Sequence, residues 1–312
     1  MAGSTPASLT ADAGASRTSA PQISPTRDAW RRFRRHRLAV IAGCVLLAMI
    51  LAVLLGPLLW PVAINDIDFT ARLQTPNAVH PLGTDDLGQD VLARMLYGGR
   101  ISLSVGLAAM MVSLVVGTLV GAVAGISRGS VDAALMWLTD LFLSLPQLPL
   151  LLVITYLFRD QLKELMGPES SIFILLVSVI GGFSWMPVAR LVRAQFLSLR
   201  EKEFVEAARA LGASTLRQVV RHILPNALGP VIVAGTINVA AAIIAESTLS
   251  FLGLGFPPDT PTWGRLLFDA KDYLDIAPHW ALSAGAAIFL TVLAINFIGD
   301  GLRDALDPRK VM

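Results

Sequence analysis

The sequence predicts an all-α, polytopic membrane protein with six transmembrane helices. Three observations support this: a mean hydropathy of +0.64, a charged content of only 15%, and apolar windows of about 20 residues that recur along the chain. Such windows are long enough to cross a hydrocarbon core of ~30 Å at ~1.5 Å per residue. A soluble chain of 312 residues would instead spread its apolar residues in periodic patterns.

The chain opens with a segment that is predicted to be a disordered, basic cytoplasmic tail, residues 1–37. Residues 1–29 are rich in Ser, Ala, Thr and Pro and lack apolar periodicity, and RRFRRHR follows at 31–37. A cleaved signal peptide is the alternative. Its basic region would lie unusually far from the start, and the apolar run of 22 residues that follows is longer than a signal sequence needs.

Residues 38–310 are predicted to form the transmembrane domain. The first span ends before Trp60-Pro61, and Pro146 and Pro149 interrupt the third. Six spans place both termini on one side, with 61–99 as an extracytoplasmic segment and 189–226 as a cytoplasmic loop. The expected spans are 38–59, 101–126, 133–158, 172–188, 228–252 and 280–298.

The distribution of basic residues predicts how the chain is oriented in the membrane. If the N-terminus is inside, the inner segments hold 18 of the 25 Lys and Arg, which is the bias of cytoplasmic loops. The sequence therefore predicts a multi-pass membrane protein with both termini in the cytoplasm. The outer segments hold 12 Asp and Glu against seven Lys and Arg, a balance that would attract a cationic substrate but is also typical of solvated loops.

Small and ionisable residues inside the spans call for separate interpretations. Gly117, Gly121 and Gly125 share one face of the second span, which predicts close helix packing, with a functional hinge as the less favoured alternative. Asp140 and Glu246 lie in apolar runs, where a carboxylate is costly, so they are candidates for a gate or pathway; solvation or hydrogen bonding near a helix end is the equal alternative. Neither has an obvious basic partner in a neighbouring span, which weighs against proton coupling. Cys44 stands alone, so no intrachain disulfide is possible.

The stretch FVEAARALGASTLRQVVRHILPNA, residues 204–227, predicts two short amphipathic helices joined at Gly212. Phe204, Ala207, Ala208 and Leu211 form one apolar stripe, and Thr215 to Gln218 fits a capping box that opens a second stripe ending at Pro225. One interpretation is a hairpin lying on the membrane surface. The other is a helix that docks in a groove of another protein.

The run Glu206-Ala207-Ala208, Gly212 and Leu224-Pro225 resembles the EAA loop, EAA-x3-G-x9-I-x-L-P, of permease subunits of bacterial ABC importers. The family's isoleucine falls at His222 here, with Ile223 beside it. HPLGTDDLGQDVLARMLYGGRISLSVG at 80–106 and ESTLSFLGLGFPPDTPTWGRLL at 246–267 resemble the C-type permeases of dipeptide, oligopeptide and nickel importers. The resemblance extends over residues 30–310 and implies a type I ABC importer permease fold.

The resemblance also implies a function and partners. In such importers the EAA loop forms a coupling helix that docks in a groove of a cytoplasmic ATPase, a role that falls here on Glu206, Ala207, Ala208 and Gly212. A B-type permease would form a heterodimer with this chain, and a binding protein would deliver substrate from outside. Residues 38–310 would then be a permease domain for peptides, with membrane lipid around it and no nucleic acid bound. Importers of nickel or haem are alternatives.

Residues for catalysis are missing from the sequence. It has no G-x4-G-K-[ST] loop, so the resemblance assigns ATP and Mg to partner ATPase subunits and expects no enzyme activity and no cofactor in this chain. The four histidines are scattered, which argues against a metal site. GTDDLGQD at 83–90 is expected to be a tight turn rather than a calcium loop. An ion-coupled carrier and a membrane scaffold remain alternative functions.

Overall fold

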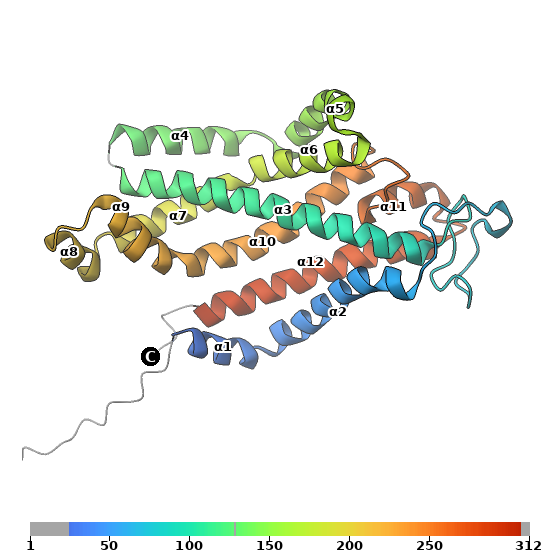
Figure 1. Cartoon of the computed structure of the whole chain (residues 1–312), viewed down its shortest axis with the longest axis horizontal. Coiled ribbons are helices and arrows are strands. Elements are labelled where there is room, and N and C mark those ends of the chain that lie inside the picture. Colours follow the sequence, from blue (N-terminus) through green and yellow to red (C-terminus); the bar gives the residue numbers. More distant parts are fainter. Residues whose placement is uncertain (1–24, 128, 307–312) are drawn as a thin grey trace, which may run out of the picture.

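The computed structural model describes residues 25–127 and 129–306, in which helices account for nearly all regular structure (Figure 1). The α-helices are α1 (Pro25–Arg35), α2 (Arg37–Leu59), α3 (Val91–Ile126), α4 (Ser130–Ser144), α5 (Gln147–Met166), α6 (Pro168–Gly182), α7 (Trp185–Leu199), α8 (Glu203–Ala210), α9 (Thr215–Gln218), α10 (Leu224–Phe251), α11 (Trp263–Ala270) and α12 (Pro278–Leu306). A π-helix, η2 (Val219–Ile223), and two 3-10 helices, η1 (Phe69–Ala71) and η3 (Lys271–Tyr273), complete the set.

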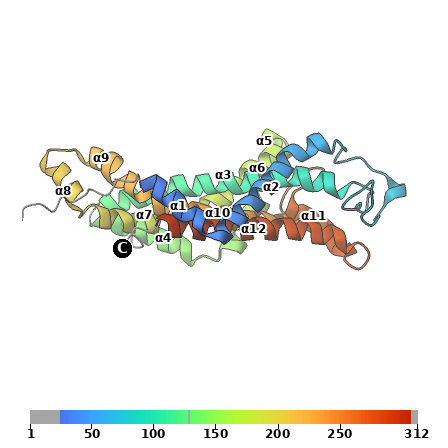
Figure 2. The same cartoon turned by 90° about the horizontal axis from the view of Figure 1, so that it is seen from below.

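The long helices form one elongated bundle. Helix α3 packs against α7, α10 and α6, while α12 packs against α10 and α2. Figures 1 and 2 show that α8, α9 and α1 lie at one end of the bundle and that the segment between α2 and α3 lies at the other. The two ends therefore carry the two predicted loop regions, 189–226 and 61–99.

Six membrane crossings are consistent with the helix lengths. Four helical stretches within the described residues are individually long and apolar enough to cross a membrane: Arg37–Leu59, Val91–Ile126, Thr215–Phe251 and Pro278–Leu306. Two further crossings each consist of a bent pair, α4 with α5 at 86° and α6 with α7 at 42°. The prediction of six spans holds when each pair is one span, but the third and fourth are not single straight helices.

The second span begins ten residues earlier than the sequence predicts, at Val91 instead of 101. The Asp90 carboxylate caps it by accepting a hydrogen bond from Ala93 N at 2.7 Å. The charged Arg100 made the apolar run look as if it began at residue 101. In the structure Arg100 belongs to α3, and its guanidinium donates to the carbonyl of Val53 in the neighbouring helix α2 at 2.9 Å. Pro57 of α2 lacks the N–H that would otherwise serve this carbonyl, so Arg100 satisfies a group that a membrane helix cannot leave unpaired.

The predicted disordered tail is wrong for its second part. Residues 25–35 form α1, which packs against α12 and α2, and the Phe33 ring lies beside Gly301 near the end of α12. The remainder of the predicted tail, residues 1–24, lies outside the described residues. An arginine-rich run gives no apolar periodicity, so the sequence did not reveal that Phe33 anchors this helix.

The glycine face of α3 is used for packing, as predicted. A Cβ on Gly121 would lie 2.4 Å from the carbonyl oxygen of Ala189, and one on Gly117 would lie 2.6 Å from Cβ of Val188. The third glycine, Gly125, faces Phe196 in the same way. Helices α3 and α7 therefore approach closely along two turns, which aligns α7 with the rigid centre of the bundle. Since α7 leads into α8, this contact also positions the end of the bundle.

Candidate functional site

The predicted coupling segment projects from one end of the bundle. Figure 1 shows α8 and α9 beyond the ends of α7 and α10, on the side where α1 and the end of α12 also lie. Among the described residues, the basic side chains that the sequence assigns to the inner side occur on α1, at the start of α2, from α7 to η2 and on α12, at this same end. The predicted coupling segment therefore protrudes from the end of the bundle at which these basic residues lie.

Gly212 forms the turn between the two short helices. Its φ is +81°, a conformation that strains every residue with a Cβ. Gly212 N donates to Arg209 O at 2.9 Å and Ala213 N donates to Ala208 O at 3.0 Å, which is the Schellman arrangement at the end of a helix. A Cβ here would meet nothing within 4 Å. Backbone conformation, not crowding, therefore requires the glycine.

Helix α8 turns most of its predicted apolar stripe outward. Val205 and Ala208 are buried, whereas Phe204, Ala207 and Leu211 are exposed, Leu211 to 89%. Glu206 is exposed as well. Of the two buried residues, only Ala208 belongs to the predicted stripe. The other three side chains of that stripe are not covered by the bundle. We call Phe204, Ala207 and Leu211 the tip patch. An uncovered patch at the tip of a protruding helix is typical of a surface that contacts another protein.

The second helix begins and ends differently from the prediction. Ser214, not Thr215, is the N-cap, and its hydroxyl accepts from Arg217 N at 3.4 Å. Gln218 does not close a capping box; its amide donates to Ala213 O at 2.7 Å. The helix also does not stop at Pro225, because α9, η2 and α10 are continuous from Thr215 to Phe251. Pro225 directly follows the π-turn and has no N–H, so the Arg221 carbonyl receives no α-helical hydrogen bond from it.

The π-helix explains the displaced isoleucine. Leu224 N donates to Val219 O five residues back, so this turn contains one residue more than an α-turn. Ile223 is buried in the cluster that also contains Phe196 and Val205, whereas His222 is half-buried. Ile223 therefore anchors the segment to the bundle, and His222 lies beside that anchor.

The two carboxylates singled out within the spans lie in different surroundings. Asp140 is exposed on α4, and Arg190 of α7 donates to its Oδ1 at 2.5 Å. The expectation that neither carboxylate has a basic partner in a neighbouring span is therefore wrong for Asp140. A second, bidentate pair joins Asp132 and Arg193 on the same two helices. These pairs tie α4 to the helix that carries the tip.

Glu246 is fully buried and is held by hydroxyl groups. Ser250 donates to its Oε1 at 2.7 Å, and Ser102 donates to Oε2 at 3.1 Å from α3. Ser247 contacts Oε2 at 3.4 Å. Ser102 also accepts from Trp263 N, so the same group connects α10 with α3 and α11. The gate-or-pathway role of Asp140 and Glu246 stays a prediction, and their geometry is that of connectors between helices.

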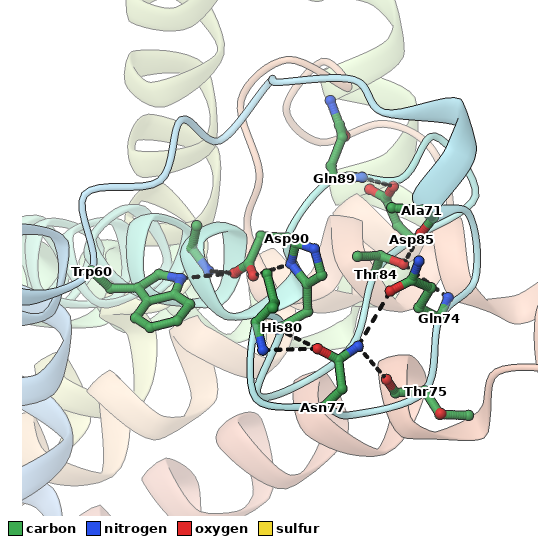
Figure 3. A network of polar contacts seen from close by, with 12 residues as sticks. Trp60, Ala71, Gln74, Thr75, Asn77, His80, Thr84, Asp85, Gln89 and Asp90 are labelled. Carbon is green, nitrogen blue, oxygen red and sulfur yellow. Dashed lines mark hydrogen bonds and ion pairs between the residues drawn. The ribbon is translucent and has the colours of Figure 1, made fainter.

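At the opposite end, the segment before α3 is folded around aspartates (Figure 3). Asp90 accepts from Trp60 Nε1 at 3.2 Å and contacts His80 Nδ1 at 2.8 Å, in addition to capping α3. Asp85 Oδ1 accepts from the backbone N–H groups of Leu87 and Gln89. These bonds form the tight turn that the sequence predicts at 83–90.

Burial dominates the electrostatics of this turn. Desolvation raises the pKa of Asp85 to about 6, although the Arg94 guanidinium 3.7 Å away and two backbone donors oppose the shift. A cavity of about 340 Å³ adjoins the pair and also borders on Arg265 and Asp269 of α11. The outer end thus presents a mixed-charge surface around this cavity, and exposed apolar side chains such as Phe69 and Val79 lie on the same outer segment.

Two family models match the sequence. The model for the binding-protein-dependent transport system inner membrane component matches residues 117–311, and the model for the N-terminal transmembrane domain of oligopeptide transport permease C matches residues 24–76. The chain belongs to the family of binding-protein-dependent transport inner-membrane components. It is therefore a multi-pass membrane protein of a transport system, as the sequence predicts.

Relatives in this family match the permease along nearly its whole length. The dipeptide transport system permease protein of Bacillus subtilis is 38% identical over 93% of this chain and 87% of its own. The glutathione transport system permease protein of Pectobacterium atrosepticum is 38% identical over 92% of both chains. The oligopeptide transport system permease protein of Mycobacterium bovis is 39% identical over 89% of this chain and 92% of its own.

The structure brings some predicted site residues together and separates others. Glu206, Ala207 and Gly212 of the permease lie exposed on the protruding segment, and Ala208 lies beneath them against the bundle. Asp140 and Glu246 do not meet; one is on α4 and the other near the outer end of α10. Sequence reasoning missed Arg190 and Arg193, which lie three residues apart on one face of α7. Their spacing of three residues was the feature of the sequence that could have indicated a shared basic face on this helix.

Proposed function

We propose that this chain is the C-type permease subunit of an ATP-driven importer of peptides, dipeptides or oligopeptides, in a bacterial cytoplasmic membrane. The observation that carries the proposal is the match along nearly the whole chain to permeases named for dipeptide, glutathione and oligopeptide transport. The bundle would form half of a translocation path, completed by a homologous B-type permease. The bent pairs leave many apolar side chains of α4 and α5 exposed, which suits a membrane protein with a second subunit beside it.

The basic end is assigned to the cytoplasm. Both described chain ends, α1 and the end of α12, lie there with α8 and α9, and basic residues are typical of the cytoplasmic side (Figure 1). The Asp-rich segment at 83–90 then lies outside, where a substrate-binding protein would arrive. ATP and Mg would be bound by cytoplasmic ATPase subunits, since this chain has no phosphate-binding loop.

The tip patch is the proposed contact with the ATPase. Phe204, Ala207 and Leu211 are apolar and uncovered, with Glu206 beside them, on a helix that α7 and Ile223 hold against the bundle. A short helix of this kind suits insertion into a groove. Movement of the ATPase would then be transmitted directly to α7 and α10, because α8 and α9 are joined to both.

Uptake into proteoliposomes tests the transport function. The chain is reconstituted with its B-type permease, ATPases and binding protein, and uptake of a labelled dipeptide is measured with ATP or with a proton gradient alone. We expect uptake only with ATP and all partners. Uptake driven by the gradient alone would indicate an ion-coupled carrier, and no uptake in any partner combination would indicate a scaffold. Nickel chelates and haem serve as competing substrates.

Substitutions at two neighbouring alanines distinguish an effect on ATPase docking from an effect on folding. Ala207→Glu places a carboxylate on the exposed side of α8, so we expect normal insertion but loss of ATPase co-purification and of uptake. Ala208→Glu places it on the buried side and should instead destabilise the segment. Ala63→Glu, at an exposed site at the other end, is the control. Normal docking and uptake in Ala207→Glu would refute the tip patch as the contact.

A further inference from the structure

Two breaks in the membrane helices border on the middle of α10. The α4–α5 bend at Leu145-Pro146 and the α6–α7 bend at Phe183-Ser184 line a cavity of about 180 Å³. A neighbouring cavity of about 210 Å³ shares Gln147 and Ser184 with it. Together they form what we call the central groove, bordered by Gln147, Phe183, Ser184, Asn238, Ala241 and Thr248.

The central groove contains backbone groups that a regular helix would satisfy internally. Pro187 follows Phe183 by four residues and has no N–H, so the Phe183 carbonyl cannot receive its helical bond. Gln147 donates to that carbonyl from across the groove at 3.3 Å. Such irregular backbone at membrane depth is tolerated where protein buries it or where it lines a wet cavity. Gln147 itself is exposed, so the groove is open in the single chain.

A second side-chain amide, from α10, lines the central groove. Asn238 lies at the middle of this 28-residue helix, and its Nδ2 donates to Ser113 Oγ at 2.8 Å. Ser113 in turn donates to the carbonyl of Ser184 at 3.0 Å. Among the described residues, neither Asn238 Oδ1 nor Gln147 Oε1 accepts a hydrogen bond from another group lining the groove. Each amide therefore keeps an acceptor, and a donor hydrogen, for a ligand.

We propose that the central groove binds the main chain of the transported peptide, through the side-chain amides of Gln147 and Asn238. This deepens the proposed function and rests on it. A peptide presents alternating N–H and C=O groups, which carboxamides complement in both directions. Within the described part of the chain no charged residue lines either cavity, so the groove binds the feature that all peptides share and leaves their side chains without an electrostatic preference. A lipid chain would leave both amides unsatisfied.

A backbone-modified peptide tests this contact. Trialanine and its analogue with an N-methyl group on the central amide are compared as substrates of the reconstituted complex, at saturating concentrations of loaded binding protein. The binding protein's own affinity for each peptide is measured separately. Wild type is expected to transport the analogue about fivefold more slowly, since one hydrogen bond is worth ~1 kcal/mol. Asn238→Leu and Gln147→Leu should transport trialanine more slowly and bring the two rates towards equality.

The control removes a hydroxyl that already has a partner. Thr236, two residues before Asn238, donates to Val233 O of its own helix at 2.7 Å, so Thr236→Val should keep the wild-type ratio. If the Asn238 and Gln147 variants keep it too, the inference is wrong. Loss of the second permease on purification would assign the groove to the subunit interface and also overturn it. If wild type takes up neither peptide with ATP, the proposed function itself fails.

Chemical protection provides a second measurement that does not depend on amide substitutions. Ala241 is small, exposed and shared by both cavities. Ala241→Cys is prepared in a Cys44→Ala background, because Cys44 is exposed, and maleimide labelling of the assembled complex is followed during ATP-driven uptake of trialanine. Labelling should be slowed severalfold relative to the same complex with ATP and unloaded binding protein. Equal labelling rates would overturn the inference.

Discussion

Arg193 on α7 holds the carboxylate of Asp132 on α4 with two hydrogen bonds, from Nε to Oδ1 at 2.6 Å and from Nη2 to Oδ2 at 2.7 Å. Arg190 and Asp140 form a single contact between the same helices. The first pair is half-buried, whereas both side chains of the second are more than half exposed. The fork of Arg193 thus fixes how α4 lies against α7.

A double-mutant cycle with Asp132→Asn and Arg193→Gln should give a coupling energy of about 1 kcal/mol or more, because a bidentate charged pair is lost. The readout is thermal unfolding of the purified complex. The same cycle at Asp140 and Arg190 is a matched control on the same helices. Its coupling should be near ~0–1 kcal/mol, since exposed pairs contribute little. Equal coupling in both cycles would contradict the distinction.

Gly121→Ala should separate α3 from α7, because its methyl group would overlap the carbonyl oxygen of Ala189. We expect less folded protein and a loss of stability of about 1–3 kcal/mol from overpacking, measured by the thermal transition of the purified complex. Gly182→Ala is the control, since a Cβ there meets nothing within 4 Å. If the two variants are equally stable, the close contact of α3 and α7 is not needed.

Glu246→Gln should keep ATP-driven uptake largely intact, because its amide oxygen still accepts from Ser250 while its amide nitrogen can donate to the Ser102 hydroxyl oxygen. Glu246→Leu should destabilise the chain by ~1–3 kcal/mol for each hydroxyl left without a partner. Asp140→Asn should likewise preserve uptake. Uptake assays on assembled complexes test all three variants. Loss of uptake in the Gln or Asn variant despite normal assembly would give these carboxylates a direct role in transport.

The outer turn should become more stable in mild acid. The pKa of Asp85, about 6 in the folded chain, exceeds the ordinary value of 3.8 for an aspartate, so the folded state binds the proton more tightly. This stabilisation is complete below pH ~3.8 and is lost as the pH rises through 6. From pH 7 to pH 5 the opening equilibrium of residues 83–90 should fall about tenfold.

Hydrogen exchange, corrected for the intrinsic pH dependence of the rate, measures this opening. Asp85→Asn should abolish the pH response, because an amide cannot ionise in this range. Asp66→Asn, in the same outer segment, should leave the response unchanged. A pH response that survives Asp85→Asn would assign it to another group.

Much of the fold was predictable from hydropathy, since lipid contact forces long apolar runs to be helices. The bends at Pro146 and Ser184 show the limit. Prolines signalled that the third span is interrupted, but an angle of 86° depends on packing between helices distant in sequence. The start of α3 was missed for a similar reason: Arg100 looked like a boundary because its acceptor, the Val53 carbonyl, was not visible in the sequence.

The coupling segment shows what periodicity omits. The stripe in α8 predicted a helix correctly, yet the buried side is defined by Val205 and Ala208, because the direction of a stripe does not say whether the bundle or a partner covers it. The π-turn directly before Pro225 adds one residue to the helical turn, so a stripe of period 3.6 could not place Ile223 in the buried cluster. The local sequence was enough to predict which residues form the short helices. Which side of each helix is buried depends on tertiary contacts.

The unbroken helix from Thr215 to Phe251 has a mechanical consequence. Its 37 residues make a rod of about 55 Å, with one end beside the tip patch and the other beside the hydroxyl groups around Glu246. A tilt of about 5° about its centre displaces each end by about 2.4 Å, in opposite directions. No backbone dihedral has to change. The two ends of the rod, on opposite faces of the membrane, would thus move in opposite directions about a centre near Val233.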